Sequence, residues 1–338
     1  MTALDVAVVG AGNWGTTLAS VIARNGHATR VWTRDPEQRD EINERRTNAR
    51  AMKGLVVPHG VNATCDLAAA LNGAELVVFV IPSQAFREVS RAAGEVLTPD
   101  QMVVHGTKGF ENGTRARMSE ILVEETCVRQ LGVVAGPNLA AEVAQGKPAG
   151  TVVASHFPRV VEAGRLALSS SQLMVFAGTD VLGVELCGAL KNVVAIAAGI
   201  ADELRVGDNA KALLVTRGMA ELMRLAFAMG AEPMTMTGLA GIGDLMVTCA
   251  SPISRNHRVG VALAKGQTLE QAVASLGMVA EGVYAARSAR ALAKEHGIDM
   301  PLFEHVDRIL HEGLAPALAL EALMRMPAGR DVARFAVR

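Results

Sequence analysis

The sequence lacks a charge excess and the common catalytic signatures. Its 338 residues include 33 Lys and Arg against 34 Asp and Glu, for a formal net charge of −1. Because these charges are spread along the chain, there is no electrostatic footprint for nucleic acid or for an anionic membrane surface. The eight histidines lack metal-ligand spacing, and neither a GxSxG nucleophile turn nor a Walker loop is present. These absences argue against a nucleic-acid-binding protein, a metal site, a serine hydrolase and a P-loop enzyme.

Cysteine is also scarce, and the four residues form no CxxC pair: Cys65, Cys127, Cys187 and Cys249. Scattered cysteines of this kind predict reduced, mostly buried thiols that act as small hydrophobic side chains, without disulfides or metal. The sequence passes directly from Met1 to its first apolar strand, with no charged segment and apolar stretch of a signal peptide. We therefore expect a cytoplasmic protein.

One segment, residues 181–200, is apolar enough to resemble a membrane span. It carries Glu185, Lys191 and Asn192, each of which is costly in hydrocarbon. The sequence therefore predicts a helix buried in protein and no membrane span.

Half of the chain is hydrophobic, enough for a large core and about two domains. Apolar, β-branched runs suited to buried parallel strands recur at 6–9, 28–33, 76–81, 102–105, 132–135, 151–155 and 173–177. After Asp180 the spacing becomes helical, beginning with a long helix at 181–201. We predict an α/β fold: an N-terminal Rossmann-like, mostly parallel sheet domain at 1–180, followed by an all-α domain at 181–338. A cleft between the two halves is the expected ligand site.

The first predicted strand ends in GAGNWG, a GxGxxG turn. Gly10 suits the tight turn, Gly12 lets backbone approach a pyrophosphate, and Gly15 lets the following helix pack on the strand. A helix beginning near Asn13 would aim unpaired N–H groups at the anion. The preceding strand and the following amphipathic helix favour dinucleotide binding over an ordinary turn.

The second predicted strand ends in Thr33 and Arg34, where many dinucleotide folds have an acid that binds the ribose 2′-hydroxyl. Arg34 instead favours a 2′-phosphate, so NADP(H) is preferred and NAD(H) is also possible. A solvated surface charge is the alternative for Arg34. Asp35 is better explained as the N-cap of a helix that begins with Pro36 and Glu37.

Other predicted strands end in small polar turns: IPSQ at 81–84, HGTKG at 105–109 and AGPN at 135–138. Open α/β sheets bind ligands at such carboxyl ends. Lys108 lies between Thr107 and Gly109, where its ammonium group could reach a ligand. A surface lysine in a turn is the alternative.

Lys191 is the strongest catalytic candidate. Its neighbours one helical turn away are mostly small and leave room beside the ammonium group: Cys187, Gly188, Val194 and Ala195. The pattern allows either a general acid/base or a core charge paired with a carboxylate such as Glu185. Asn192 could orient the lysine or bind a nicotinamide.

Two later segments contain candidate anion contacts. GLAGIGDLMVTC at 238–249 places three glycines before Asp244. Ser254, Arg255 and Asn256 then open another predicted helix, where a cation and amide donors suit a phosphate. From the residues alone, an ordinary Ser254 N-cap followed by solvated side chains is the more economical explanation.

Eight motifs occur in order within a match that spans about residues 6–305: GAGNWG, GTKG, AGPN, GALKN, NAKALLVTRG, GIGDL, SRN and AEG. With them the chain resembles the bacterial NAD(P)-dependent glycerol-3-phosphate dehydrogenases. The resemblance implies reversible reduction of dihydroxyacetone phosphate to sn-glycerol 3-phosphate for phospholipid synthesis, and a homodimer through the helical domain.

The resemblance also implies roles for particular residues. Lys191 matches the proton acceptor. The implied cofactor contacts are Asn13, Trp14, Arg34, Ala140, Val279 and Glu281. The implied substrate contacts are Lys108, Gly136, Asn138, Lys191, Asp244, Ser254, Arg255 and Asn256, with Lys108 and Arg255 also near the cofactor.

Two positions depart from the family pattern: Asn138 stands where threonine or serine is common, and Arg205 where glycine is common. Ketopantoate-type and hydroxyacid dehydrogenases are an alternative, because they share this architecture and a lysine on the helix after the Rossmann domain. Their pattern, however, has an asparagine four residues after that lysine. Here Asn192 is adjacent, and Ala195 occupies the later position. A nucleotide sensor without chemistry is the other alternative, and Lys191 argues against it.

Overall fold

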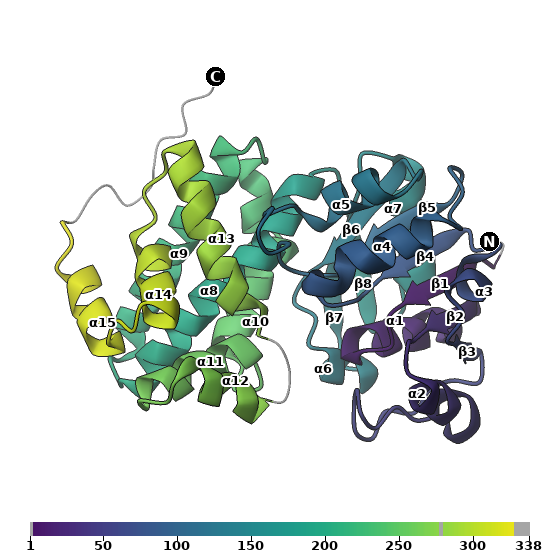
Figure 1. Ribbon diagram of the computed structural model, residues 1–338, viewed down its shortest axis with the longest axis horizontal. Helices are drawn as coiled ribbons and strands as arrows, with labels where there is room; N and C mark the ends of the chain where they lie inside the picture. Colours follow the sequence, from purple (N-terminus) through teal and green to yellow (C-terminus); the bar gives the residue numbers. More distant parts are fainter. Residues whose placement is uncertain (1–2, 277–279, 328–338) are drawn as a thin grey trace. The chain divides into compact units, whose positions relative to one another are not determined.

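The computed structural model describes residues 3–276 and 280–327 (Figure 1). The chain forms two compact units, Met1–Val181 and Leu182–Arg338. Each unit has its own arrangement of elements and is described separately.

The first unit contains one eight-stranded sheet with the order β3-β2-β1-β4-β5-β6-β7-β8. All neighbouring strands are parallel except β6 and β7, which confirms the predicted mostly parallel Rossmann-like fold. The strands are β1 (Asp5–Val9), β2 (Ala28–Trp32), β3 (Val61–Thr64), β4 (Leu76–Phe79), β5 (Met102–His105), β6 (Gln130–Ala135), β7 (Ala149–Ala154) and β8 (Leu173–Gly178). The strand order reverses between β1 and β4, the position at which such sheets bind ligands.

Two details of the sheet differ from the sequence prediction. The strand β3 was not predicted, because its four residues contain only two buried apolar side chains, Val61 and Ala63. The β7 strand is antiparallel to β6, although its apolar run suggested a parallel strand. Periodicity reports that a strand is buried, but it does not report the direction of its neighbour.

Helices cover both faces of this sheet. Along β1, Val6 and Val8 join one core cluster and Ala7 and Val9 join the other, because successive side chains of a strand point to opposite faces. The helices of the unit are α1 (Asn13–Arg24), α2 (Pro36–Asp40), α3 (Leu67–Leu71), α4 (Phe86–Gly94), α5 (Met118–Glu125), α6 (Ala140–Ala144) and α7 (Pro158–Leu168). Helices α1, α6 and α7 supply one cluster, and α3, α4 and α5 supply the other.

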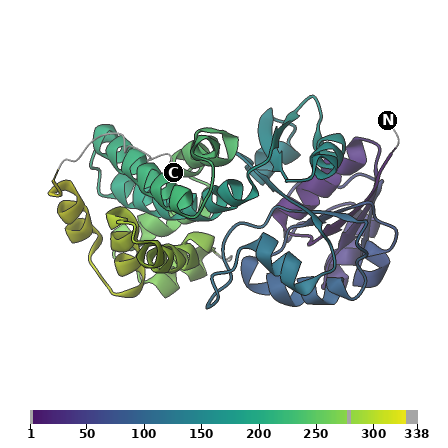
Figure 2. The same cartoon turned by 90° about the horizontal axis from the view of Figure 1, so that it is seen from above.

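The regular elements among the described residues of the second unit are all helices, which confirms the predicted all-α domain (Figure 2). Its α-helices are α8 (Val181–Glu203), α9 (Asp208–Ala228), α10 (Asp244–Ala250), α11 (Arg255–Ala264), α12 (Leu269–Leu276), α13 (Glu281–His296), α14 (Pro301–His311) and α15 (Pro316–Met324). Helix α8 has a mean hydropathy of 1.7 in its most apolar window and could span a membrane by length and composition, but 94% of that window is buried. The prediction of a helix buried in protein is confirmed.

Glycine lets α8 and α11 pack with their backbones in contact. A methyl group added at Gly199 would lie 2.0 Å from the His257 carbonyl oxygen, and one at Gly260 would lie 2.0 Å from that of Ile196. Each side of this helix crossing therefore needs a residue without a side chain. The close packing fixes the first half of α11 against the C-terminal part of α8.

Of the four cysteines, Cys187 and Cys249 are buried, whereas Cys65 is half-buried and Cys127 is exposed. The expectation of mostly buried thiols is therefore wrong for Cys127, which lies in the turn after α5. All four are free thiols. Burial raises the pKa of Cys249 to about 12, so this thiol stays neutral.

A buried carboxylate holds the start of α14. Both oxygens of Glu221, on α9, accept the Leu302 N–H at 3.0 Å, and one also accepts the Phe303 N–H at 3.3 Å. These N–H groups have no partner within their own helix, so Glu221 caps α14 from a neighbouring helix. Burial raises the pKa of Glu221 from its ordinary value of 4.5 to about 7, against the effect of these hydrogen bonds.

This raised pKa makes the stability of the protein depend on pH. Between about pH 4.5 and pH 7 the folded state holds a proton that the unfolded state has lost, so stability is highest below this window and falls as pH rises through it. At 1.36 kcal/mol per pKa unit, the loss is about 3 kcal/mol. We expect the free energy of unfolding to fall by about 3 kcal/mol more in the wild type than in Glu221→Gln between about pH 5 and pH 8. Denaturant titrations at each pH measure the free energy of unfolding of both proteins. An equal fall in the two proteins would contradict the prediction.

Candidate active site

The glycine turn after β1 has the geometry that a pyrophosphate turn needs. Helix α1 begins at Asn13, as predicted, with Gly12 as its N-cap. A methyl group at Gly10, whose φ is +115°, would lie 2.4 Å from the Val80 carbonyl oxygen, and one at Gly15 would lie 1.9 Å from that of Gly10. By contrast, a methyl group at Gly12 would meet nothing within 4 Å. Gly10 and Gly15 are required by close packing, whereas Gly12 faces open space beside the helix N-terminus.

The end of β2 agrees with the capping interpretation of Asp35. Its carboxylate accepts the N–H groups of Glu37 at 3.0 Å and Gln38 at 3.4 Å, and Pro36 occupies the first helical position of α2. Asp35 is therefore occupied as a helix cap. Arg34 is exposed at the same strand end.

The loops after β4 and β5 are tied together at the same edge of the sheet. The Thr107 hydroxyl donates to the Ile81 carbonyl at 2.7 Å and accepts the Ile81 N–H at 3.2 Å. The Gln84 side chain donates to the Phe110 carbonyl and accepts the Asn112 N–H. Lys108, half-buried, sits in the loop that these bonds fix. A methyl group at Gly106 would lie 3.1 Å from the Trp14 indole nitrogen, so Trp14 packs beside the same loop.

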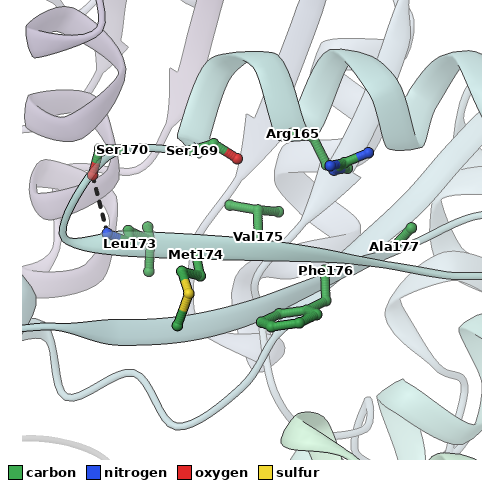
Figure 3. Close-up of a pocket in the computed structure, with 8 residues that line it drawn as sticks. All are labelled: Arg165, Ser169, Ser170, Leu173, Met174, Val175, Phe176 and Ala177. Atoms are coloured by element: carbon green, nitrogen blue, oxygen red, sulfur yellow. Dashed lines mark hydrogen bonds between the residues drawn. The ribbon is translucent and has the colours of Figure 1, made fainter.

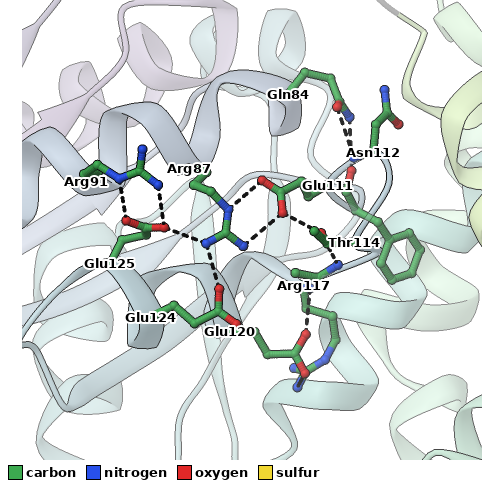
Figure 4. A network of polar contacts seen from close by, with 12 residues as sticks. Gln84, Arg87, Arg91, Glu111, Asn112, Thr114, Arg117, Glu120, Glu124 and Glu125 are labelled. Carbon is green, nitrogen blue, oxygen red and sulfur yellow. Dashed lines mark hydrogen bonds and ion pairs between the residues drawn. The ribbon is translucent and has the colours of Figure 1, made fainter.

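An arginine network that sequence reasoning missed anchors this loop to two helices (Figure 4). The Arg87 guanidinium, on α4, holds both oxygens of Glu111 at 2.7 and 2.9 Å. The same guanidinium bonds Glu124 at 2.7 Å and Glu125 at 2.6 Å at the end of α5. The hydrogen bonds from Arg87 hold the pKa of the Glu111 carboxyl below its usual range. The partners are 24 to 38 residues apart, a separation that no local motif reveals.

The AGPN segment lies against β7. The Asn138 Nδ2 donates to the Thr151 hydroxyl at 2.9 Å, and its Oδ1 is buried with no hydrogen-bond partner among the described residues. A methyl group at Gly136 would lie 2.9 Å from the Gly150 carbonyl oxygen. Ala140 begins α6 just beyond this segment. Asn138 therefore supplies a hydrogen-bonding side chain at this position.

In the second unit, Lys191 lies in a buried polar cluster. It is 4% exposed, and its Nζ forms an ion pair with Asp244 at 2.7 Å and also donates to the Thr248 hydroxyl. The Thr248 hydroxyl in turn donates to the Asp244 carbonyl at 2.6 Å. The structure thus brings together two predicted residues 53 positions apart. Sequence reasoning missed Thr248, although it follows Asp244 by four residues and so shares its helix face.

The start of α11 lies close to α8 and α13. Ser254 is the N-cap, accepting the His257 N–H at 3.4 Å, and Arg255 is exposed at the first helical position. The buried Asn256 accepts the Gly282 N–H at 3.0 Å through Oδ1, so its amide nitrogen is the donor that could serve a phosphate. Asn192 donates to the Gly188 carbonyl at 3.2 Å. Glu281 is the first residue of α13, whereas Val279 lies outside the described residues.

Arg205 lies in the turn between α8 and α9 with a φ of +53°. This left-handed conformation explains why glycine suits the position, since a side chain there costs roughly 1–2 kcal/mol. Glycine loses more conformational freedom on folding than arginine does, and this cost of about 0.5–1 kcal/mol offsets part of the strain that the substitution would relieve. We expect Arg205→Gly to raise the free energy of unfolding by about 0.5–1 kcal/mol, measured by denaturant titration. A loss of stability would show that Arg205 makes a contact that outweighs its strain.

A surface pocket lies along β8 and the end of α7 (Figure 3). Met174 and Phe176 are its exposed apolar residues, and Arg165 lines its α7 side. None of the predicted site residues lines this pocket. Because it lacks the glycine turn and both candidate lysines, we do not identify it with the active site.

The first unit thus defines a dinucleotide-binding protein of the Rossmann class, joined to a helical unit with a buried lysine and carboxylate. Residues 5–161 match the family model of the NAD-dependent glycerol-3-phosphate dehydrogenase N-terminus, and residues 180–321 match that of the C-terminus. The chain belongs to the NAD-dependent glycerol-3-phosphate dehydrogenase family.

Curated relatives match along nearly their whole length. The chain is 46% identical over 327 residues to a glycerol-3-phosphate dehydrogenase, NAD(P)+, of Azotobacter vinelandii, covering 97% of this chain and 96% of the relative. The relative of the same name from Streptomyces griseus is 44% identical over 323 residues, covering 95% and 96%. The resemblance seen in the motifs is thereby confirmed.

Solved structures also support membership of this family. The crystal structure of glycerol-3-phosphate dehydrogenase from Coxiella burnetii superposes with a TM-score of 0.91 at 39% identity, covering 96% of this chain and 99% of that one. A ketopantoate reductase from Ralstonia eutropha reaches 0.58 at 17% identity, covering 95% and 100%, and shares the fold alone. The ketopantoate-type alternative therefore has the weaker support.

Proposed function

We propose that the chain catalyses the reversible reduction of dihydroxyacetone phosphate to sn-glycerol 3-phosphate with NADPH or NADH, supplying glycerophospholipid synthesis. The buried Lys191, held by Asp244 and Thr248, carries the proposal, because it places an ammonium proton donor in a buried polar cluster of the helical unit. A nucleotide sensor would not need such a group. The relatives that support the reaction are named glycerol-3-phosphate dehydrogenase, NAD(P)+.

The proposed cofactor contacts begin at the glycine turn, and Lys191 is the proposed proton donor. Gly10, Gly12, Asn13, Trp14 and Gly15 form the cofactor turn, whose helix N-terminus suits a pyrophosphate. Other cofactor contacts in the proposal are Arg34, Lys108, Ala140, Arg255, Val279 and Glu281. The nicotinamide, when bound, supplies the hydride for the carbonyl carbon. Lys191 donates a proton to the carbonyl oxygen, and it accepts that proton in the reverse direction.

The proposed substrate contacts follow from the family resemblance. Lys108 and Arg255 supply positive charge for the phosphate, and Ser254 and Asn256 supply polar groups at the start of α11. Gly136 and Asn138 complete the proposed substrate contacts from the first unit. Asp244 acts through its ion pair with Lys191. We further propose a cytoplasmic protein that forms a homodimer through its helical unit, on family grounds.

The preference for NADP(H) rests on Arg34. Because Arg34 is exposed at the end of β2 and Asp35 is occupied as a helix cap, the strand end offers a cation for the 2′-phosphate. We expect Arg34→Ala to raise KM for NADPH by about 10- to 100-fold, as for loss of a charged hydrogen bond, and KM for NADH by less than about threefold. Steady-state rates with each cofactor measure both values, and equal losses would reject the 2′-phosphate role.

The reaction itself is tested with purified full-length protein, dihydroxyacetone phosphate and either cofactor. The expected result is loss of reduced-nicotinamide absorbance with formation of sn-glycerol 3-phosphate, identified with an enantiomer-specific enzyme. Absence of turnover with both cofactors, in protein that binds NADPH, would favour the sensor instead.

A further inference from the structure

Beneath the glycine turn lies a buried polar network. The carbonyl oxygen of Ala11, the middle residue of GAG, accepts hydrogen bonds from Gln38 Nε2 and Asn48 Nδ2, both at 2.9 Å. The Thr16 hydroxyl is a third donor at 3.1 Å. Asn48 and Thr16 are fully buried, and Gln38 is half-buried. Three donors on one buried carbonyl fix the direction in which that carbonyl points.

This direction matters for the neighbouring glycine. The peptide bond between Ala11 and Gly12 is trans, so its N–H points opposite to its C=O. Because the donors draw the Ala11 carbonyl inward, the Gly12 N–H points outward, where Gly12 is exposed and has open space beside it. The network therefore presents the positive end of this peptide dipole to an anion and keeps the negative end away.

The same network reaches the end of β2. Gln38 Oε1 accepts the Thr33 hydroxyl at 2.6 Å, and Thr33 Oγ1 accepts the Asp35 N–H at 3.2 Å. Arg34 lies between Thr33 and Asp35 in the chain. Gln38 Nε2 also donates to Asn48 Oδ1 at 3.0 Å, so both ends of the Gln38 amide are engaged and its orientation is fixed.

We propose that Gln38 is a positioning residue that couples the cofactor's pyrophosphate turn to the backbone on either side of Arg34. Asn48 bonds the turn and Gln38 but not the strand end, whereas Thr33 bonds the strand end and Gln38 but not the turn. The preference for NADP(H) then depends on a chain of hydrogen bonds from Ala11 to Asp35 as well as on the charge of Arg34. The proposal rests on the proposed function, because it takes Arg34 as the 2′-phosphate contact.

The two ends of the network predict separable effects on binding. Thr33→Val keeps the side-chain shape but removes the hydroxyl, and we expect the dissociation constant for NADPH to rise about tenfold while that for NADH changes less than about twofold. Thr33→Ser, which keeps the hydroxyl, is the matched control with near wild-type binding. Asn48→Ala is expected to weaken NADPH and NADH about equally. Gln38→Met, which breaks both links, is expected to weaken both cofactors and to lower the NADPH preference.

Binding of NADPH and of NADH to the full-length protein is measured by calorimetry, with no need for turnover. Thermal midpoints report whether each variant folds. If Thr33→Val does not fold, the NADPH preference of Gln38→Met tests the proposal instead. Equal weakening of both cofactors by Thr33→Val, or an unchanged preference in Gln38→Met, would overturn the proposal and leave the network a structural role.

Arg34→Ala, measured in parallel, separates this proposal from the proposed function. If Arg34→Ala loses NADPH preference and Thr33→Val does not, only the coupling fails. If Arg34→Ala weakens both cofactors equally, the 2′-phosphate assignment fails and the coupling proposal falls with it. Absence of nicotinamide cofactor binding by the wild type would contradict both.

Discussion

Replacing Lys191 by arginine is expected to lower kcat by about 10²- to 10⁴-fold while the dissociation constant for NADPH stays within about twofold. Arginine keeps a positive charge beside Asp244, but it stays protonated in proteins and cannot donate its proton to the substrate oxygen. Single-turnover and steady-state rates give kcat, and calorimetry gives the cofactor affinity.

The choice of arginine follows from the burial of the ion pair. Lys191 and Asp244 are 4% and 3% exposed, so Lys191→Ala would leave a buried carboxylate without its partner at a cost of roughly 3–5 kcal/mol. Lys265→Met is the matched control, because Lys265 is an exposed lysine in the same unit. It should keep wild-type turnover. Normal turnover in Lys191→Arg would remove the lysine from the mechanism.

The second large effect concerns the phosphate. Arg255→Met is expected to raise KM for dihydroxyacetone phosphate by about 10- to 100-fold, because a charge-assisted hydrogen bond to the phosphate is lost. Since the role is binding rather than proton transfer, kcat should fall much less. Initial rates across substrate concentrations separate the two constants.

Arg258→Met is the matched control for Arg255→Met. Arg258 is also exposed on α11, but it follows Arg255 by three residues and lies farther from the helix N-terminus. Its replacement should leave KM within about twofold, because the anion-binding effect of a helix falls off within the first turn. Equal increases in KM for both variants would point to general surface charge instead of a phosphate site.

The parts of the fold predicted from sequence were those with strong local patterns. Long apolar runs located seven of the eight strands, and the shift to helical spacing after Asp180 located the all-α unit. The short β3 was missed, because a four-residue strand carries little periodic signal. The direction of β7 was also missed, because strand direction depends on distant residues.

In the candidate site, too, local patterns identified residues but not their distant partners. Lys191 and Asp244 were identified by their local surroundings and by family motifs, but their ion pair across 53 positions is visible only in the structure. Local spacing does not reveal that Asn48 bonds the Ala11 carbonyl 37 residues away, or that Arg87 holds Glu111. Such contacts depend on how elements pack, so a polar residue in a loop gives no sign of its distant partner.

The identity of the substrate is tested by comparing three ketones with the purified protein. With NADPH, kcat/KM is measured for dihydroxyacetone phosphate, for dihydroxyacetone and for 2-ketopantoate. We expect efficient turnover of dihydroxyacetone phosphate and a kcat/KM at least about 10²-fold lower for each of the other two, since neither supplies a phosphate. Equal or greater efficiency with 2-ketopantoate, or with dihydroxyacetone, would contradict a phosphorylated-ketone reductase.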